Sequence, residues 1–505
     1  MENQLSCFLL VFTSLIFIFM ALRTWMNSKS NQSASKLPPG PPKLPLIGNL
    51  HLFVGTQPHH CLARLARKYG PVMLLQLGEV STVVISSAEG AKEVMKTHDS
   101  TFAERPPLFA AETITYNFQD LVFSRGDYRR QIRKICVMEL LSQKRVQSFR
   151  TIREEEVSNL VEAIKLNAGL AVNLKNLVYS FSLSILSRAA FGGRFKQQDA
   201  FKKLLPDIVE LFGGLSVVDV YPSLKFLCLI NAMRPKHKRL HREADEILES
   251  VIQEHKATKL TAVMKQENEV YDLVQVLVDI QDRGDVEIPL STSGIKAILM
   301  DLFLAGAEPT VSIVEWAMSE LLRNPQVLQR AQAEVRQVVG DREYVNESAI
   351  VELKYLNLVI KETLRLHPPA PLLLPRECQE RCEVMGCVIP VQSRVIVNAW
   401  AIGRNHNYWT EADTFDPDRF MESSVGYKGT DFELIPFGAG KRMCPGMLYG
   451  IVNVELILAN LLHQFDWKLP DGMDPQDLDM AEVFGASLRR KHDLCLVPLA
   501  HQFGT

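Results

Sequence analysis

The order of apolar and polar residues along this chain predicts a protein built mainly from helices. Apolar residues recur with helical spacing over most of the sequence. Two neighbouring runs rich in β-branched residues, Val72 to Leu77 and Val80 to Ser86, instead predict a pair of strands, and Met385 to Asn398 predicts further strands. Helices are predicted over 60–68, 88–97, 150–165, 235–258 and 355–367. The predicted fold class is therefore mainly α with small β-sheets.

Two long apolar stretches lie inside this pattern. Ser293 to Arg323 is predicted as one long helix, and it ends at Asn324-Pro325, where a proline stops helical structure. The last long helix is predicted over Met447 to Leu462. Both are apolar enough to cross the centre of a large core.

A third apolar stretch lies at the N-terminus, where Ser6 to Leu22 contains only apolar residues, serine and threonine. Its length is close to the roughly 20 residues that span a bilayer. Basic residues follow it, at Arg23, Lys29 and Lys36, which predicts that this side faces the cytosol. We interpret residues 1–27 as one uncleaved membrane anchor. A cleaved signal peptide is the alternative, but a basic leader and a clear cleavage site are both missing.

Residues 28–57 are predicted to join the anchor to the body. The first part is polar, and residues 38–42, Pro-Pro-Gly-Pro-Pro, form a stiff extended hinge that cannot be helical. Neither an internal repeat nor a low-complexity run follows. Residues 58–505 are therefore interpreted as one large catalytic domain.

The amino-acid composition limits which kinds of partner and which cellular compartment the protein is expected to have. Hydrophobic residues make up 47% of the 505 residues, enough for a sizeable core, and the formal charge of −2 offers no basic field for nucleic acid. The nine cysteines are scattered without a paired framework, which suits a reducing compartment. Cys378, Cys382 and Cys387 cluster, but their spacing favours ordinary thiols over a zinc site.

The most informative motif is the segment 437–446, which reads F-x-x-G-x-x-x-C-x-G. Its glycines allow a tight turn, and Arg442 places a cation two positions before Cys444. A helix is predicted directly after the cysteine, so helix N-terminal N–H groups are expected to favour a thiolate. A cysteine thiolate is one of the ligands that hold haem iron. The alternative is a buried structural cysteine in a glycine-rich turn.

Two further motifs precede this loop. Glu362 and Arg365 are three positions apart on a predicted helix, so their side chains share one face and can pair. Residues 415–420, Phe-Asp-Pro-Asp-Arg-Phe, follow them. In this order the three motifs resemble those of the cytochrome P450 family, and the resemblance covers almost the whole chain. The segments 37–42, 102–106 and 466–470 are similar to the plant microsomal group, within which the chain resembles enzymes that oxidise terpenoids and monoterpene-derived indole alkaloids.

The resemblance implies the cytochrome P450 fold with haem b, iron protoporphyrin IX, as cofactor. Cys444 would be the axial ligand of the iron, with Phe437 and Gly438 in the same loop against the haem. Glu362, Arg365 and Arg419 would form a buried structural network and take no part in the chemistry.

The resemblance also implies which cations meet the two carboxylates of the haem. They are Arg442, Arg376 and Arg133, because the planar guanidinium fork suits a carboxylate. Arg129 stands where the family has tryptophan, which removes one expected contact. For Arg133 a solvated basic helix face is the alternative, and such a face could also dock an acidic redox partner.

Residues 305–310, Ala-Gly-Ala-Glu-Pro-Thr, lie where the family activates oxygen. The resemblance implies that Gly306 leaves room for oxygen and that Glu308 helps to deliver protons. Pro309 replaces the threonine of the family, has no hydroxyl and kinks a helix. Thr310 is a candidate substitute, although it lies roughly 100° further round the helix. We expect a water relay from Glu308; the alternative is a reaction that depends less on threonine-assisted proton delivery.

The resemblance places five segments around the substrate: 109–118, 211–220, 301–309, 369–374 and 483–488. They are mostly apolar, so a lipophilic small molecule is the expected substrate.

These features together predict a haem-thiolate monooxygenase of plant specialised metabolism. It would be a single-pass protein of the endoplasmic reticulum membrane, with its catalytic domain in the cytosol. It would use O2, electrons from NADPH–cytochrome P450 reductase, and a lipophilic substrate for which a terpenoid is the first expectation. One alternative is a haem-thiolate enzyme that catalyses oxidative rearrangement, cyclisation or dehydrogenation, for example of an indole alkaloid. The other is a haem-binding protein without turnover.

Overall fold

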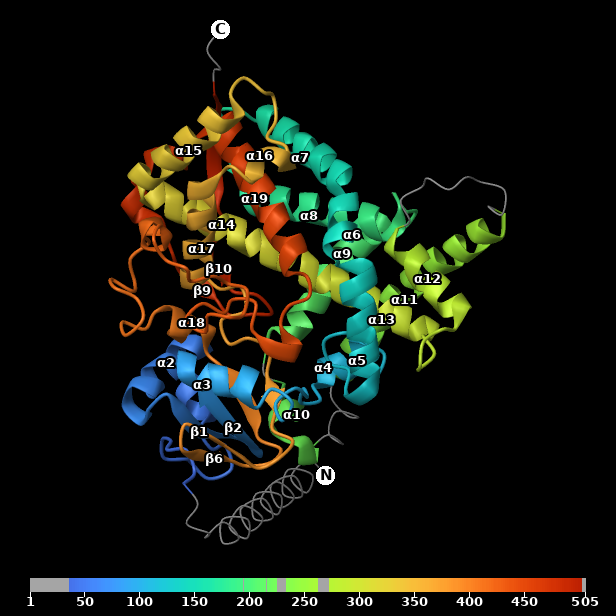
Figure 1. The fold of residues 1–505 in the computed structure, drawn as a ribbon, viewed down its shortest axis with the longest axis vertical. Coiled ribbons are helices and arrows are strands. Elements are labelled where there is room, and N and C mark those ends of the chain that lie inside the picture. The colour runs from blue at the N-terminus through green and yellow to red at the C-terminus, as the bar shows by residue number, and fades with distance from the viewer. Residues whose placement is uncertain (1–35, 194, 215, 225–232, 262–271, 502–505) are drawn as a thin grey trace, which may run out of the picture.

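The computed structural model describes residues 36–193, 195–214, 216–224, 233–261 and 272–501. The predicted anchor and most of the polar part of the predicted linker lie outside the described residues. In Figure 1 the helices form a broad body, and the sheet that contains β1 and β2 lies at its lower left. The described part is mainly helical with small sheets, as predicted.

The largest sheet is built from the predicted strand pair and two later strands. β1 (Val72–Leu77) and β2 (Val80–Ile85) pair antiparallel, with Val72 opposite Ile85. β2 then pairs parallel with β7 (Arg394–Val397), and β7 pairs antiparallel with β4 (Arg376–Glu377). The order of the strands in the sheet is β1-β2-β7-β4. Arg376, on the edge strand β4, therefore lies close to segments far away in sequence.

The other strands are short. The stretch 385–398 was predicted as strand, and it contains β7 and β6 (Cys387–Ile389), which are separated by a turn. Three small groups complete the set: β5 (Cys382–Val384) with β6; β9 (Glu482–Val483) with β10 (Arg489–Arg490); and β11 (Cys495–Ala500) between β3 (Val172–Asn173) and β8 (Phe465–Lys468).

The predicted helices are present with small shifts of their ends, and 88–97 changes from an α-helix to a π-helical turn at Glu93. The helices before the centre of the chain are α2 (Pro58–Tyr69), α3 (Ala88–Lys92), α4 (Phe109–Ile114), α5 (Gly126–Ile135), α6 (Gln143–Ser148), α7 (Arg150–Lys165), α8 (Leu174–Phe191), α9 (Gln198–Phe212), α10 (Val217–Val220), α11 (Met233–Thr261) and α12 (Leu273–Arg283). Those that follow are α13 (Thr292–Gly306), α14 (Glu308–Arg323), α15 (Pro325–Val339), α16 (Glu347–Ile350), α17 (Lys354–Leu366), α18 (Ala399–Gly403) and α19 (Met447–Gln464).

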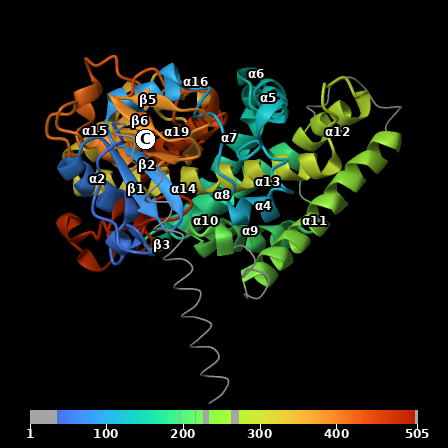
Figure 2. The same cartoon turned by 90° about the horizontal axis from the view of Figure 1, so that it is seen from below.

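The core surrounds α13 and α14. Figure 2 shows these two helices running one after the other through the middle of the molecule, with α11 and α12 at the end away from the sheet. α14 packs against α8, α17 and α19, and its residues 310–322 are all buried. Within the described residues Thr292–Arg323 is the one stretch long and apolar enough to cross a membrane, and 72% of its most apolar window is buried in the protein, as in a core helix.

The helix predicted over 293–323 is present as α13 and α14, which meet at Ala307, where the kink expected from Pro309 lies. Pro309 has no N–H, so it cannot donate the helical bond to the carbonyl four residues earlier. The Thr310 hydroxyl donates to the Gly306 carbonyl over 3.2 Å, and regular bonding resumes where Val311 N–H donates to the Ala307 carbonyl over 3.2 Å. The helical hydrogen bonding is therefore interrupted at the predicted kink.

A buried ionic network joins α17 to the segment that follows α18. Arg365 donates twice to the Glu362 carboxylate, each bond 2.7 Å long, and Arg419 donates to it over 2.9 Å. Arg365 also donates over 2.6 Å to the carbonyls of Gly403 and Ala412. Glu362 and Arg365 are 0% and 1% exposed, so this network, predicted from the motifs, holds the segment in front of the cysteine loop.

Glu362→Gln should lower the free energy of unfolding by about 3–5 kcal/mol, because it leaves two buried guanidinium groups without their carboxylate. Asp418→Asn is the matched control, since Asp418 pairs with Arg330 at the surface, where side chains are 48% and 44% exposed. That pair should contribute less than about 1 kcal/mol. Urea unfolding of both variants measures the difference, and equal losses would show that burial of the network is unimportant.

Candidate active site

Residues 437–446 form a tight loop that leads into α19. The Cys444 N–H donates to the Phe437 carbonyl over 2.9 Å, which closes the loop. Gly438 and Gly440 have φ values of +67° and +71°, and a Cβ on Gly440 would lie 2.1 Å from the Met95 carbonyl oxygen. Only glycine fits at Gly440, so the turn predicted from the sequence is built as expected.

The Cys444 side chain is exposed, but the space that it faces is an internal cavity. Burial raises the pKa of its thiol, while the Gly446 N–H and the Arg133 cation act in the opposite direction. The N–H at the helix N-terminus acts in the expected direction, but burial of the thiol outweighs it. A bound metal ion deprotonates a coordinating thiol outright, so a thiolate at Cys444 depends on the metal.

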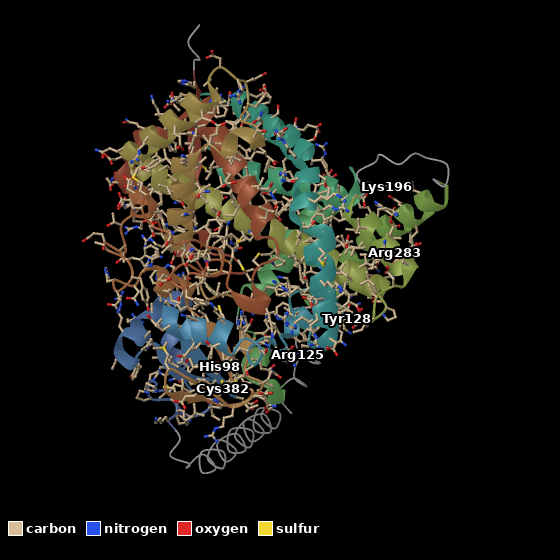
Figure 3. All side chains as sticks on the ribbon, viewed as in Figure 1. His98, Arg125, Tyr128, Lys196, Arg283 and Cys382 are labelled. Carbon is tan, nitrogen blue, oxygen red and sulfur yellow. The ribbon has the colours of Figure 1, made fainter. Side chains whose placement is uncertain are left out.

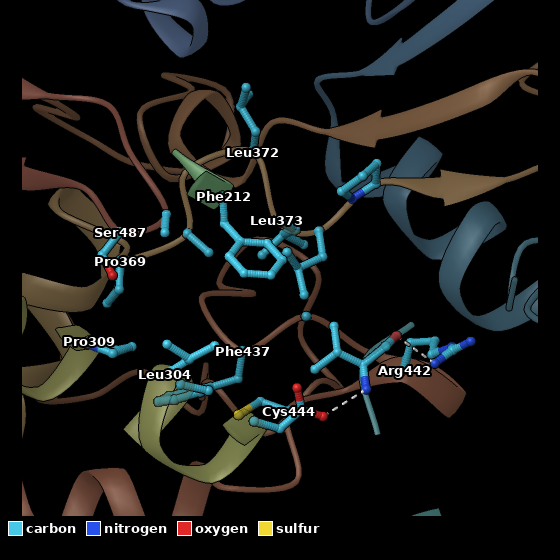
Figure 4. A pocket seen from close by; sticks show the side chains of 18 of the residues that line it. Phe212, Leu304, Pro309, Pro369, Leu372, Leu373, Phe437, Arg442, Cys444 and Ser487 are labelled. Atoms are coloured by element: carbon cyan, nitrogen blue, oxygen red, sulfur yellow. Dashed lines mark hydrogen bonds between the residues drawn. The ribbon is translucent and has the colours of Figure 1, made fainter. Parts of the chain in front are cut away.

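The cavity has a volume of about 540 Å³ and a mostly apolar wall. Figure 4 shows Leu304 and Pro309 on one side of it, Leu372 and Leu373 on another, and Cys444 at the bottom. All five predicted segments contribute to the wall: Thr115, Phe212, several residues of 301–310, all of 369–374, and 484–487. Phe303 is an exception within its segment, because it is 2% exposed and stacks on Phe191 in the core.

The three arginines predicted from the resemblance all line this cavity. Arg442 donates to the carbonyls of Ala103, Val122 and Ser124 over 2.6, 2.9 and 2.7 Å. Arg133 donates to the Met443 carbonyl over 2.7 Å, and Arg376 to the Ala439 carbonyl over 2.9 Å. Backbone carbonyls carry no full negative charge. Burial, together with the positive charge of neighbouring arginines, accordingly lowers the pKa of all three guanidinium groups, for Arg442 to about 9.

A fourth arginine, Arg105, joins this cluster and was not among the predicted site residues. It donates to the carbonyls of Leu374 and Pro375 over 2.6 and 2.8 Å, and its Nε is buried without a hydrogen-bond partner. Burial and the charges of Arg376 and Arg442 lower its pKa. The signal in the sequence was its place beside Phe102 and Ala103, an apolar context in which a solvated arginine is out of place.

Carboxylates near the cluster are few. Asp99 pairs with Arg376 over 3.2 Å, and Glu104 lies 4.0 Å from Arg442. Arg129, the residue that replaces tryptophan, lies 3.7 Å from Glu104 but does not line the cavity. Its charge adds to the cluster, because it contributes to the lowered pKa of Arg133, Arg376 and Arg442.

Only part of the segment 305–310 lines the cavity. Gly306, Pro309 and Thr310 line the cavity, whereas Glu308 does not. A Cβ on Gly306 would first meet Leu186, at 3.1 Å, so this glycine also allows close packing against α8. Glu308 is 8% exposed, and burial raises the pKa of its carboxyl group, while Arg489 and Lys175 lower it. A proton route from Glu308 to the cavity therefore has to pass the break in the helix.

The clustered cysteines lie far from this site, at the β5–β6 edge, where Figure 3 labels Cys382. Cys378, Cys382 and Cys387 are free cysteines, and burial raises the pKa of each thiol.

The cavity fits a haem. Its wall is mostly apolar, a thiol faces into it from one loop, and four arginines that donate mainly to backbone carbonyls border it. Cys444 would hold the iron, and the four arginines would hold the two carboxylates. Fold and site together define a haem-thiolate protein.

The comparison with protein families agrees with this assignment. The model of the cytochrome P450 family matches residues 38–496, so the chain belongs to the cytochrome P450 family and is a haem-binding monooxygenase. Solved structures of a zebra fish cytochrome P450 with abiraterone and with progesterone superimpose with TM-scores of 0.74 and 0.76, at 24% sequence identity over 88% of this chain and all of the other. These confirm the fold.

Plant proteins are much more similar in sequence. Desmethyl-deoxy-podophyllotoxin synthase from Sinopodophyllum hexandrum is 49% identical over 96% of this chain and 95% of its own length. Premnaspirodiene oxygenase from Hyoscyamus muticus is 49% identical over 97% and 98%. Tabersonine 6,7-epoxidase isoform 1 from Catharanthus roseus is 47% identical over 97% of each chain. The similarity to plant terpenoid and alkaloid oxidases confirms the resemblance inferred from the motifs.

Cys444→Ser should abolish the red-shifted Soret band of the reduced carbon monoxide complex, because serine offers no thiolate to the iron. Cys136→Ser is a suitable control, since Cys136 is buried at a distance in sequence and its thiol pKa is raised by burial. Absorption spectra of the two purified variants measure the effect. Survival of the band in Cys444→Ser would show that another residue binds the iron.

Proposed function

We propose that this chain is a membrane-anchored monooxygenase that inserts one oxygen atom from O2 into a lipophilic plant specialised metabolite, with a terpenoid as the first candidate. The observation that carries this proposal is the apolar wall of the cavity on the side away from Cys444, where Leu304, Leu372 and Phe484 come from three separate segments. Such a lining beside the haem space suits a lipophilic molecule. The similarity to premnaspirodiene oxygenase and tabersonine 6,7-epoxidase supports oxygen insertion as the reaction.

In this reaction the protein would position the substrate, exclude water from the cavity and deliver protons. When bound, the haem supplies the iron at which O2 is activated. Leu304, Leu372 and Phe484 would exclude water and orient the substrate, because they form apolar walls on separate elements. The arginine cluster would fix the cofactor and thereby the distance between the iron and these walls.

The expected proton route is the part of the site that differs most from the family pattern. The Ala305 carbonyl has no helical donor, because its partner four residues later would be Pro309. The Thr310 hydroxyl already donates to the Gly306 carbonyl. We infer that water bound at the break carries protons from Glu308 to the cavity, with the free Ala305 carbonyl as an acceptor. Glu308 is suited to this role because burial raises its carboxyl pKa.

A specific observation favours the second candidate function. A proline at 309 removes the hydroxyl that would assist proton delivery, which suits oxidative rearrangement, cyclisation or dehydrogenation better than hydroxylation. The similarity to a named synthase, desmethyl-deoxy-podophyllotoxin synthase, is compatible with that reading. A protein that binds haem without turnover is disfavoured, because the chain belongs to a family of monooxygenases.

The partners follow from the proposed reaction. Electrons would come from NADPH–cytochrome P450 reductase, and Arg130 and Lys134 on α5, beside the haem-facing Arg133, would offer it basic contacts. The anchor, residues 1–27, would place the protein in the endoplasmic reticulum membrane as a single-pass protein with its catalytic domain in the cytosol.

Co-expression with a plant reductase tests the substrate class directly. Microsomes are supplied with NADPH and with two matched panels, terpenes and indole alkaloids, and mass spectrometry reports the products. A terpene product heavier by one oxygen atom, labelled by ¹⁸O2, supports the proposal. A product with unchanged oxygen content supports the second candidate, and an oxygenated product formed from alkaloids alone would replace the terpenoid as substrate class. The Cys444→Ser variant serves as the inactive control.

Pro309→Thr should raise the amount of product formed per NADPH consumed, provided that the enzyme is an ordinary hydroxylase. A hydroxyl would then order the proton route, and less reduced oxygen would escape as peroxide. Haem content is measured first, because the substitution can also restore the helix and move the cavity wall. Unchanged coupling with full haem content would mean that the water route suffices. Loss of the native product together with new hydroxylated products would favour the second candidate.

Protease added to sealed microsomes should digest the catalytic domain, because the basic residues after the anchor predict a cytosolic body. Asn346-Glu347-Ser348 is a glycosylation acceptor sequence and provides an internal reporter. The measurement is the mobility of the protein before and after protease and glycosidase treatment. Protection of the body, or sugar on Asn346, would reverse the predicted orientation.

A further inference from the structure

Two buried acids from different elements meet at one backbone segment beside the cavity. Asp301, on α13, accepts hydrogen bonds at Oδ2 from the N–H groups of Leu121 and Val122, over 2.7 and 3.2 Å. Asp120 accepts at Oδ2 from Val122 and Phe123, over 3.2 and 2.9 Å. The two carboxyl groups thus share the N–H of Val122, which places their oxygens close together.

The surroundings of this pair disfavour two negative charges. Asp120 is 0% exposed and Asp301 is 7% exposed. The second oxygen of Asp120, Oδ1, is buried and has no hydrogen-bond partner. Two ionised carboxylates so close together would repel each other, and one unpaired ionised oxygen would be costly to bury. Burial raises the pKa of Asp120 to about 6, and burial with the charge of Asp120 raises that of Asp301.

The same backbone segment also holds an arginine of the proposed haem site. While its N–H groups bond to the two acids, its carbonyls accept from Arg442: Leu121 over 3.4 Å, Val122 over 2.9 Å and Ser124 over 2.7 Å. The acids therefore lie on one side of the segment and Arg442 on the other. A shift of the segment at the acids would move the acceptors that orient the guanidinium group.

We propose that Asp120 and Asp301 are positioning residues, which share one proton and, through residues 121–124, hold Arg442 in place for a haem carboxylate. The role is independent of the substrate, so it stands or falls separately from the proposed reaction. It concerns how firmly the haem is held, and haem release measures it without turnover.

Four other ionisable groups interact electrostatically with the pair. Arg105 and Arg442 contribute positive charge, and Tyr128 and Cys136 are the nearby weak acids. Figure 3 labels Tyr128 near the start of α5. Burial raises the pKa of Tyr128 to about 12 and also raises that of Cys136. The two weak acids therefore stay neutral, whereas burial places the pKa of Asp120 at about 6 and raises that of Asp301.

Transfer of haem from the intact protein to an excess of apomyoglobin tests the proposal. Asp301→Ala removes the acceptor of two N–H groups and should speed haem release at least tenfold. Asp301→Asn keeps an amide oxygen as acceptor and should release haem at a rate near that of the wild type at pH 6. Glu334→Ala is the matched control, because Glu334 likewise accepts two backbone N–H groups, those of Tyr355 and Leu356, over 2.7 and 2.9 Å, and does not line the cavity. Its release rate should be unchanged.

The pH dependence separates proton sharing from a purely structural role. A pair whose folded-state pKa is raised stabilises the segment at low pH and loses this effect as pH rises through that pKa. The ratio of wild-type to Asp301→Asn release rates should therefore increase from pH 6 to pH 9, while titration of the iron ligand is common to both and cancels. A flat ratio, or equal release from Asp301→Ala and Glu334→Ala, would overturn the proposal. If Asp301→Ala yields no folded protein, the pH ratio decides alone.

Discussion

Repulsion among buried arginines is the constraint around which the active site is built. Arg105, Arg133, Arg376 and Arg442 border one cavity and donate their hydrogen bonds mostly to backbone carbonyls. Buried cations of one sign are costly unless an anion joins them. The four come from segments far apart in sequence, so the fold has to hold this unfavourable arrangement together. A dianionic ligand in the cavity would relieve it.

In the network around Glu362, by comparison, the buried cation Arg365 has its hydrogen bonds satisfied by the protein itself. Arg365 has a bidentate carboxylate and three further carbonyl partners, and its contacts are complete without a ligand. Arg105, by contrast, has a buried Nε without any partner. The Glu362 network therefore needs no ligand to satisfy its cation, whereas Arg105 borders the cavity with donor capacity left over.

Local patterns in the sequence predicted local structure well. The strand pair β1–β2, the helices α2, α7, α17 and α19 and the turn before Cys444 depend on neighbours within a few residues, and each was predicted with small errors at the ends. The pairing of Glu362 with Arg365 likewise follows from helical spacing. The resemblance to the family added the longer-range arginines, Arg376 and Arg442.

What the sequence could not show depends on contacts between distant segments. Arg105 belongs to the site only because β4 and the cysteine loop fold against it, and Asp120 meets Asp301 only through tertiary packing. The direction of Glu308, away from the cavity wall, is set by the break at Ala307, whose size no propensity predicts. The raised pKa of Cys444 arises from burial, which outweighs the local helix effect expected from its position.

The arginine cluster gives the account its most direct test. Haem and its dimethyl ester have the same ring and iron but differ in the two carboxylates. Their affinities for the haem-free protein, made in cells that cannot synthesise haem, should differ by at least about a hundredfold in favour of haem, because the ester leaves the arginines without an anion. Equal affinities would contradict the account and show that the ring and the cysteine alone hold the cofactor.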